Sequence, residues 1–254
     1  MPGTKESLTT MCGIISSVSY YPARSVFADF VEMAAIAIRN SFDHSARETR
    51  EARYISLVGK YKPHDQAKFG ELLQHLVETL GLQAGDVLGE LYMALGVSNA
   101  DMGQFFTPPS ISTLLSTLVM DIEHIQSQVK RRGFVTLSEP ASGSGAMVIA
   151  FANSMLELGI NYQQHLHVTL VDLDIRAVHM AFIQLSLLHI PAVVVHGNTL
   201  TLAEHSQWHT PSHVMNLFDY KLRRGFSLES EMGNAYLKAN PGTQLADFTG
   251  GVRR

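Results

Sequence analysis

A nine-residue segment rich in glycine and serine, EPASGSGAM at residues 139–147, has the composition of a loop that holds a ligand against its backbone. It follows the apolar run 134–137 and leads into apolar side chains at helical spacing, which predicts a strand, a turn and a helix. Gly143 and Gly145 put no side chain in a ligand's way and can adopt positive φ. Such a turn is equally typical of a plain connection, and the segment alone does not decide between the two.

Polar side chains stand at the ends of two further expected strands. Asp172 ends the run HVTLVDL, and Asn198 follows the run AVVVH. A carboxylate at such a position can accept hydrogen bonds from both hydroxyls of a ribose, and an amide can pair with an adenine edge. Together with Glu139 they suit a cofactor that contains adenosine. Taken singly, Asp172 could cap the next helix and Asn198 could form a turn.

The elements that would position these groups alternate between strand and helix. We expect a helix capped by Ser110, strands at 134–137, 167–173 and 192–196, a helix over 177–188, and one more strand at 213–218. This order predicts the α/β class with a parallel sheet, in which ligands lie at the carboxyl ends of the strands. Three apolar stripes between Val26 and Leu95 predict helices without strands. We therefore divide the chain into a helical segment (1–100), a sheet domain (101–225) and a loop-rich or disordered tail (226–254).

Composition narrows the classes of function. The formal charge of −4 over 254 residues excludes a strongly basic nucleic-acid arm, although the clusters 130–132 and 221–224 could meet phosphate or be plain helix-end charge. The single cysteine, Cys12, indicates a reducing cytoplasm without disulfides or a thiolate metal cluster. His205, His209 and His213 could line a helix and bind a metal, but Pro211 interrupts the pattern, so we expect no metal. The apolar patch MCGIISSV is too short to span a bilayer, and we expect no membrane association.

A second motif, GQFFTPP at residues 103–109, precedes the glycine-rich segment. With EPASGSGAM after it, the chain resembles the adenine-N6 DNA methyltransferases, in particular the modification subunits of type I restriction systems. The resemblance covers residues 86–199, including the leading helix DVLGELYMAL. It implies a Rossmann-like class I sheet that binds S-adenosylmethionine, with double-stranded DNA as substrate and a modification or specificity subunit as partner.

The resemblance also implies roles for particular residues. Phe105 and Phe106 would shelter the sulfonium end of S-adenosylmethionine, where a π face favours a cation. Thr107 would bind the cofactor's carboxylate. The other implied cofactor contacts are Glu139 near the amino group, Ser142, Gly143 and Gly145 beneath it, Asp172 on the ribose and Asn198 at adenine N6. Glu139 and Asn198 both stand where the family usually has Asp, and Ser142 replaces the usual Cys or Gly.

One departure from the family concerns catalysis. The family's Asn/Asp-Pro-Pro-aromatic element, which holds and stacks on the flipped adenine, does not follow Asn198, and the only Pro-Pro pair is Pro108-Pro109. The nearest substitute is NLFDY, with Asn216 as the candidate catalytic amide. Three hypotheses stay open: an active methylase, a degenerate methylase that binds DNA or a partner, and a nicotinamide-dependent enzyme. The third is disfavoured because the glycines lack the Gly-x-Gly-x-x-Gly spacing.

Overall fold

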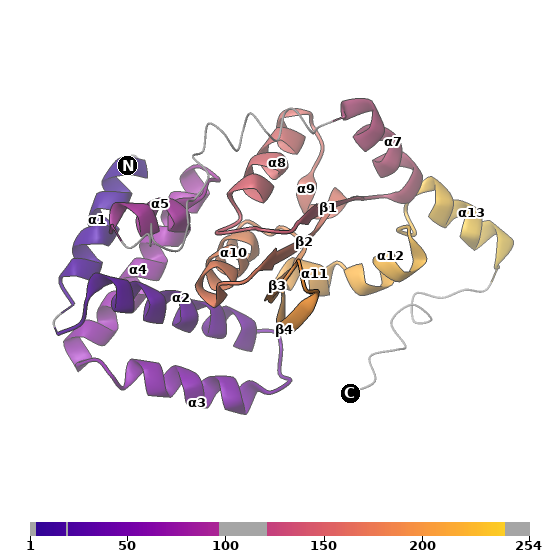
Figure 1. Cartoon of the computed structure of the whole chain (residues 1–254). Helices are drawn as coiled ribbons and strands as arrows, with labels where there is room; N and C mark the ends of the chain where they lie inside the picture. The colour runs from indigo at the N-terminus through magenta and orange to yellow at the C-terminus, as the bar shows by residue number, and fades with distance from the viewer. Residues whose placement is uncertain (1–3, 19, 97–120, 242–254) are drawn as a thin grey trace.

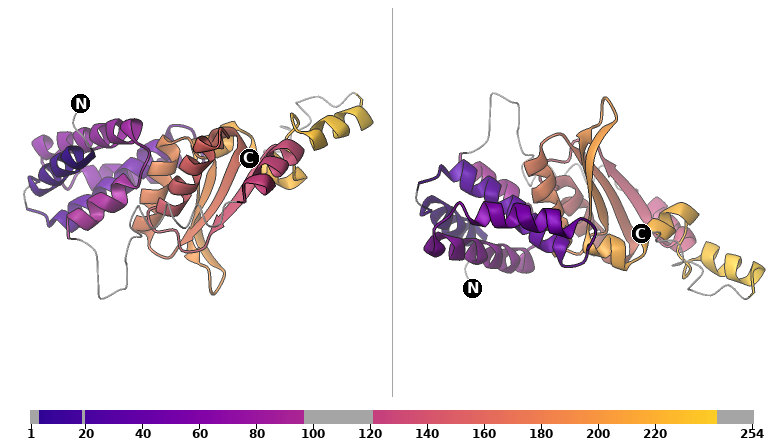
Figure 2. Two further views of the ribbon diagram at one scale, coloured as in Figure 1. Left: turned by 90° about the horizontal axis from the view of Figure 1, so that it is seen from above. Right: turned by 90° about the horizontal axis from the view of Figure 1, so that it is seen from below.

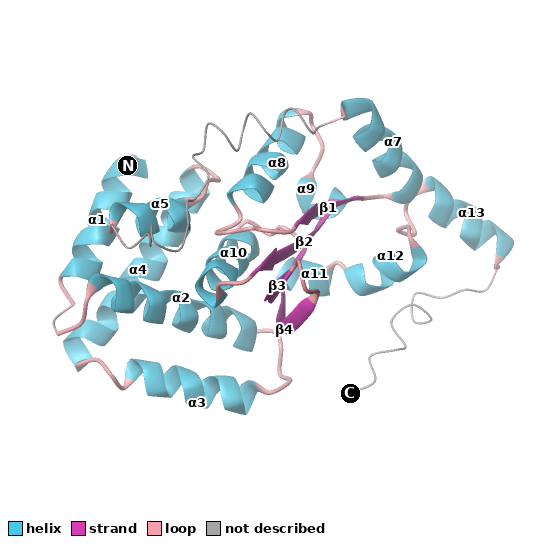
Figure 3. Cartoon of the chain, viewed as in Figure 1, coloured by secondary structure: helices cyan, strands magenta, loops and turns pink. Residues whose placement is uncertain are grey.

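The computed structural model describes residues 4–18, 20–96 and 121–241. A four-stranded sheet in the order β1-β2-β3-β4 lies between two groups of helices (Figures 1 and 3). The strands are β1 (Val135–Glu139), β2 (Leu166–Asp172), β3 (Ala192–Asn198) and β4 (Ala203–His209). β1, β2 and β3 are parallel, as the alternating pattern predicts, and β4 pairs antiparallel with β3. The α/β prediction is confirmed.

The described residues before residue 97 form helices. They are α1 (Thr4–Ser16), α2 (Ala23–Asn40), α3 (Arg47–Val58), α4 (Pro63–Leu82) and α5 (Val87–Ala94). Three of them carry the predicted apolar stripes: Phe27 and Phe30 from α2, Leu72 and Leu76 from α4, and Leu88 from α5 are all fully or almost fully buried. Burial of these side chains on one side of each helix stabilises the bundle through the hydrophobic effect. Helix α1 was not predicted, and α3 includes most of the polar segment 44–53, which was expected to be a connection.

The helical bundle and the sheet share one hydrophobic core. Helix α10 (Ile175–Leu187) packs against α2 on one side and against β2 and β3 on the other. Every residue of α10 from Ala177 to Ser186 is buried, so this helix is central and not amphipathic. Figure 2 shows α2 lying alongside the sheet layer in both views. One hydrophobic core thus continues across the boundary expected between the helical segment and the sheet domain at residue 100.

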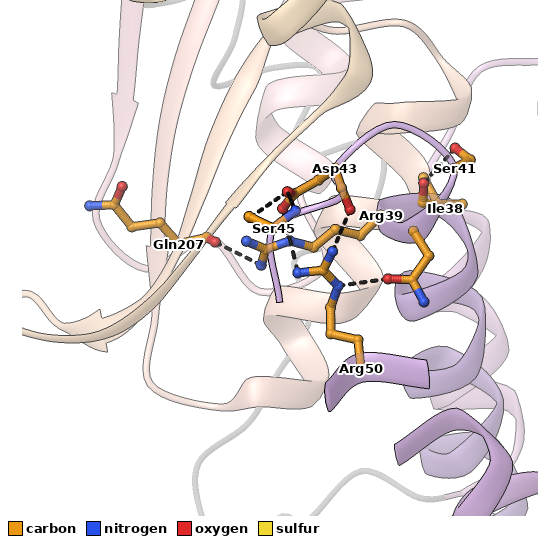
Figure 4. Close-up of polar contacts among 8 residues, drawn as sticks. Ile38, Arg39, Ser41, Asp43, Ser45, Arg50 and Gln207 are labelled. Atoms are coloured by element: carbon orange, nitrogen blue, oxygen red, sulfur yellow. Dashed lines mark hydrogen bonds and ion pairs between the residues drawn. The ribbon is translucent and has the colours of Figure 1, made fainter. Parts of the chain in front are cut away.

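A polar network ties the bundle to the edge strand β4. Arg39 at the end of α2 donates to the carboxylate of Asp43 (2.9 Å) and to the backbone carbonyl of Gln207 in β4 (3.0 Å). Arg50 of α3 forms an ion pair with Asp43 over 3.5 Å (Figure 4). Burial opposes the charge on Asp43, but hydrogen bonds from Ser45 and Arg39 outweigh it and hold the pKa of the carboxyl below its usual value.

The remaining helices flank the sheet. They are α7 (Ile122–Arg132), α8 (Ala146–Glu157), α9 (Tyr162–His165), α11 (Pro211–Met215), α12 (Phe218–Arg224) and α13 (Glu231–Ala239). Helix α8 follows the glycine-rich turn as predicted and buries Val148, Phe151 and Met155. No helix among the residues described here is both long and apolar enough to cross a membrane.

Two expectations for the chain after Asn198 are wrong. Residues 213–218 are not a strand, because Thr210 caps α11 by accepting a hydrogen bond from the His213 amide and Pro211 stands at the first helical position. His205 and His209 lie on strand β4 and His213 lies on α11, so these histidines do not share a helix, as the position of Pro211 indicated. Residues 231–239 of the expected loop-rich tail form α13, which Ser230 caps. The helix expected after Ser110 lies outside the described residues.

Candidate nucleotide site at the carboxyl ends of the strands

The glycine-rich turn is held against the end of β2. The Gly143 amide donates to Asp172 Oδ2 over 2.8 Å, and the Ser142 amide donates to the carbonyl of Val171 over 3.0 Å. Gly143 has φ 52° and Gly145 has φ 94°, conformations in the left-handed region that side chains with a Cβ rarely adopt. The turn between β1 and α8 therefore lies directly beside the Asp172 carboxylate.

Asp172 accepts hydrogen bonds from backbone amides on both sides of the strand end. Its Oδ1 accepts a hydrogen bond from the Asp174 amide over 2.9 Å, so it shapes the turn into α10. It does not cap α10, because Asp174 is the N-cap and accepts from the Arg176 amide. Each carboxylate oxygen offers a second lone pair. Asp172 can thus hold the glycine-rich turn and still accept hydrogen bonds from a ligand.

Asn198 and Glu139 are partly engaged in local turns. Asn198 Oδ1 accepts from the amides of Leu200 and Thr201 at 2.9 and 3.2 Å, which is the turn role considered for it. Glu139 Oε1 accepts from the Ala141 amide over 3.2 Å. The Thr199 hydroxyl donates to the carbonyl of Pro140 over 2.6 Å, which links the end of β3 to the glycine-rich turn. The three strand ends are therefore brought together at one edge of the sheet.

The Ser142 hydroxyl at this edge is one of the buried polar groups that lack a partner among the described residues. A buried polar atom without a partner costs about 1–3 kcal/mol. A ligand over the turn would offset this cost by pairing with the hydroxyl.

Exposed leucines form an apolar rim around the same edge. Leu173, directly after Asp172, exposes 63% of its surface, and Leu200 and Leu202 in the β3–β4 connection expose 95% and 83%. His196 in β3 contacts the Leu173 carbonyl over 3.2 Å, so the rim is continuous with the strand ends. These leucines carry no periodic signal in the sequence, because each is a single apolar residue in a loop.

A buried polar cluster beneath the turn was also missed. The Ser144 hydroxyl donates to Asp86 Oδ2 over 2.5 Å, and Gln184 Nε2 donates to Asp86 Oδ1 and to the Ser144 carbonyl, both over 2.9 Å. Asp86 also caps α5 by accepting from the Gly89 amide. Burial raises the pKa of the Asp86 carboxyl, and the three hydrogen bonds oppose this effect. The signal in the sequence was a lone glutamine within the apolar helix 175–187.

Two groups of expected site residues are not brought to this edge. Phe105, Phe106 and Thr107 lie outside the described residues. Asn216 lies at the amino ends of the strands, where its Nδ2 donates to the carbonyl of Gln163 over 3.0 Å, just before β2 begins. This placement gives no support to Asn216 as a catalytic amide beside the cofactor. The described residues contain no group of three or more metal-ligating side chains placed to hold an ion.

The fold and the strand-end geometry define an α/β protein with a candidate nucleotide site at the carboxyl edge of its parallel strands. The family model described as N-6 DNA Methylase matches residues 83–231, more than half of the chain. The chain therefore belongs to the N-6 DNA methylase family, whose members use S-adenosylmethionine as methyl donor and DNA as substrate. No match to a curated protein was found.

Proposed function

We propose that this chain is a methyltransferase-like protein of the restriction-modification type that binds S-adenosylmethionine at the carboxyl ends of β1, β2 and β3. The observation that carries the proposal is the hydrogen bond from the Gly143 amide to the Asp172 carboxylate, which joins the glycine-rich turn to the ribose-binding candidate. The buried Ser142 hydroxyl, which has no partner within the described part of the chain, supports it. The family match to residues 83–231 supplies the choice of S-adenosylmethionine over other nucleotides.

The residues fit this cofactor in a consistent way. Asp172 would accept from the ribose hydroxyls, and the Ser142–Gly145 turn would pass beneath the methionine end with Glu139 near the amino group. The Asn198 amide and the leucine rim would adjoin the adenine. Phe105, Phe106 and Thr107 would complete the site from the preceding segment. When bound, the cofactor supplies an electrophilic methyl group.

The target of the reaction, in this proposal, is the N6 amino group of adenine in double-stranded DNA, and the setting is the cytoplasm. The described residues would contribute the cofactor-binding site for such a reaction. No Asn/Asp-Pro-Pro-aromatic element follows Asn198 in the sequence, and Asn216 lies at the other end of the sheet. Groups that hold the flipped adenine would then come from a modification or specificity subunit.

The second candidate function is a degenerate methylase that keeps the cofactor site and acts by binding DNA or a partner. The same observation about Asn216 favours it, because the described residues place no amide of the family's catalytic type beside Asp172. The two functions share the cofactor site and differ in whether a methyl group is transferred.

The test of the shared site is calorimetric titration of the chain with S-adenosylmethionine, and with NAD as a comparison. We expect saturable binding of S-adenosylmethionine and none of NAD. Asp172→Ala should weaken binding by about 10- to 150-fold for each charge-assisted hydrogen bond it removes. Asp174→Ala is the matched control, because Asp174 is the neighbouring carboxylate and caps α10. Equal affinity in wild type and Asp172→Ala would show that S-adenosylmethionine does not bind at the strand ends.

A further inference from the structure

The two basic clusters of the sequence lie side by side in the structure. They occupy the last turns of α7 and α12. The hydrogen bond that joins these two helix ends links residues 93 positions apart in the chain. Arg132 Nε donates to the carbonyl of Gly225 over 2.7 Å, and the Ser227 amide donates to the carbonyl of Arg132 over 2.7 Å. Figure 2 shows both helices at the end of the molecule away from α1–α5. We call this the basic surface, and its cations are Lys130, Arg131, Arg132, Lys221, Arg223 and Arg224.

The basic surface lies at the amino ends of the strands, opposite the glycine-rich turn. The Phe218 ring of α12 packs against Phe134, just before β1, at 5.6 Å between centroids, and against His167 near the start of β2 at 4.9 Å. The five-residue strand β1 separates this end from Glu139. At about 3.3 Å per residue, that is on the order of 15 Å.

Aromatic rings hold several of these cations in place. The Arg132 guanidinium lies over Phe134 at 5.1 Å, Lys221 Nζ lies over Phe218 at 4.8 Å, and Arg223 lies over Tyr220 at 5.1 Å. A ring face attracts a cation without neutralising its charge, and it limits the freedom of the long side chain. The cations are thereby preorganised while their charge stays available to an anion.

Carboxylates nearby do not balance the positive charge. Glu231 pairs with Lys130 over 3.4 Å, but both side chains are more than half exposed, and such pairs contribute little. Asp219 contacts His213 over 3.1 Å but keeps its negative charge, because burial lowers the pKa of His213 and favours the neutral imidazole; with Glu229 and Glu231 it still leaves six cations facing three carboxylates. Glu229 is the remaining acidic residue between 218 and 231, and it lines the same clefts as Lys221. The excess of cations here contrasts with the chain's net charge of −4.

A structural role for these charges explains only part of the arrangement. Cations in the last turn of a helix interact favourably with the helix dipole, and this accounts for each cluster separately. It does not account for two like-charged helix ends packed together, because their repulsion destabilises the fold. Lys130 and Lys221 line one cleft of about 470 Å³, together with Asn216 and Ser227. An anion bound across the two helix ends would relieve this repulsion.

We propose that the basic surface binds the phosphate backbone of double-stranded DNA, at the end of the sheet opposite the candidate cofactor site. The choice of DNA as the polyanion rests on the proposed function, whereas the surface itself is defined by α7 and α12 alone. DNA would be gripped here through phosphate contacts, which are independent of base sequence. The chain could then remain on DNA whether or not the cofactor site is filled.

The test is the binding of a fluorescent 30-base-pair duplex, measured by anisotropy across a series of salt concentrations. The variant Arg131→Gln/Arg223→Gln removes two exposed cations. Each lost phosphate contact should reduce the slope of log K against log salt by about 0.9, and the pair should weaken binding on the order of fifty-fold at 0.1 M salt. Arg24→Gln/Arg47→Gln is the matched control, because both arginines are exposed on α2 and α3 and the change in net charge is identical.

Calorimetric titration of each variant with S-adenosylmethionine separates the two proposals. We expect unchanged cofactor affinity in both double variants, which also shows that they fold. DNA binding that depends on Arg131 and Arg223 supports the basic surface even if wild type binds no cofactor. The proposal is overturned if wild type does not bind the duplex, if both double variants weaken it equally, or if duplex RNA or polyglutamate binds as tightly as DNA does.

Discussion

The Ser144 hydroxyl donates a hydrogen bond to the buried carboxylate of Asp86, and the two residues are 58 positions apart in the chain. One partner belongs to the glycine-rich turn and the other caps α5 of the helical bundle. The candidate cofactor turn is therefore supported from beneath by the bundle. The same carboxylate accepts hydrogen bonds from the Gly89 amide and from Gln184, so both of its oxygens have partners.

The first prediction is that Asp86→Ala lowers the free energy of unfolding by about 2–4 kcal/mol. The change removes a helix cap and leaves buried donors of Gln184 and Ser144 without an acceptor. Asp86→Asn should cost less, because its carbonyl oxygen still accepts and its amide can donate to Ser144. Urea denaturation measures both, with the exposed cap Asp121→Ala of α7 as the control, expected near 1 kcal/mol. Equal losses in Asp86→Ala and Asp121→Ala would show that the buried cluster contributes nothing.

The second prediction concerns the glycine-rich turn. Gly143→Val should abolish detectable binding of S-adenosylmethionine, because a β-branched side chain occupies the ligand's space and resists a φ of 52°. Gly159→Val is the matched control: Gly159 also has positive φ (73°), and open space surrounds the position of its missing Cβ. Circular dichroism should show retained helix in both variants. Loss of binding in the control as well would assign the effect to backbone strain.

The third prediction is that the chain by itself transfers methyl groups to DNA slowly or not at all. Losing one preorganised hydrogen-bond partner of a transition state costs a factor of about 100–1000. The measurement is tritiated methyl transfer to unmethylated genomic DNA, with a complete adenine methylase as the positive control. Asn216→Ala should leave any residual rate unchanged, because Asn216 lies at the amino ends of the strands. Robust transfer that vanishes in Asn216→Ala would refute this prediction and restore NLFDY as the catalytic loop.

The fourth prediction follows from two buried histidines. Burial lowers the pKa of His167 to about 3 and that of His179 to about 4, whereas both titrate near 6.5 when the chain is unfolded. Below pH 6.5 the unfolded chain therefore binds more protons, and stability falls as the pH drops. Each histidine should cost about 2 kcal/mol between pH 6.5 and pH 5.

Urea denaturation of His179→Phe at pH 7.5, 6 and 5 tests this dependence. Phenylalanine keeps an aromatic contact with Trp208, whose ring centroid is 4.8 Å from that of His179, and it removes one titrating group. The stability of the variant should fall less steeply with decreasing pH than that of wild type. The exposed His44→Gln serves as control and should follow the wild-type slope. A His179→Phe slope identical to that of wild type would contradict the assignment.

Local patterns in the sequence determined the strand–turn–helix unit of β1 and α8, the parallel strands β2 and β3, and the helices α2, α4 and α5. They did so because apolar periodicity and glycine act over a few neighbouring residues. The same reasoning located Asp172, because its strand is a continuous apolar run. The local patterns did not indicate α1 or α3, and the polar segment 44–53, most of which lies in α3, was expected to be a connection. Apolar periodicity did not predict β4, because this strand exposes polar side chains on both faces and three of its seven residues are histidine or glutamate. It also passed over the Thr-Pro start of α11, a cap signal that was present in the sequence.

Only the tertiary structure decided which distant residues meet. It joined Asp86 to Ser144, set the ends of α7 and α12 side by side, and put Asn216 at the end of the sheet away from Asp172. Such contacts join residues tens of positions apart, so no local periodicity records them. They depend on how a shared core packs the bundle, α10 and the sheet together. The sequence thus supplied the chemical groups of the candidate cofactor site, and the packing of the core decided which of them face one another.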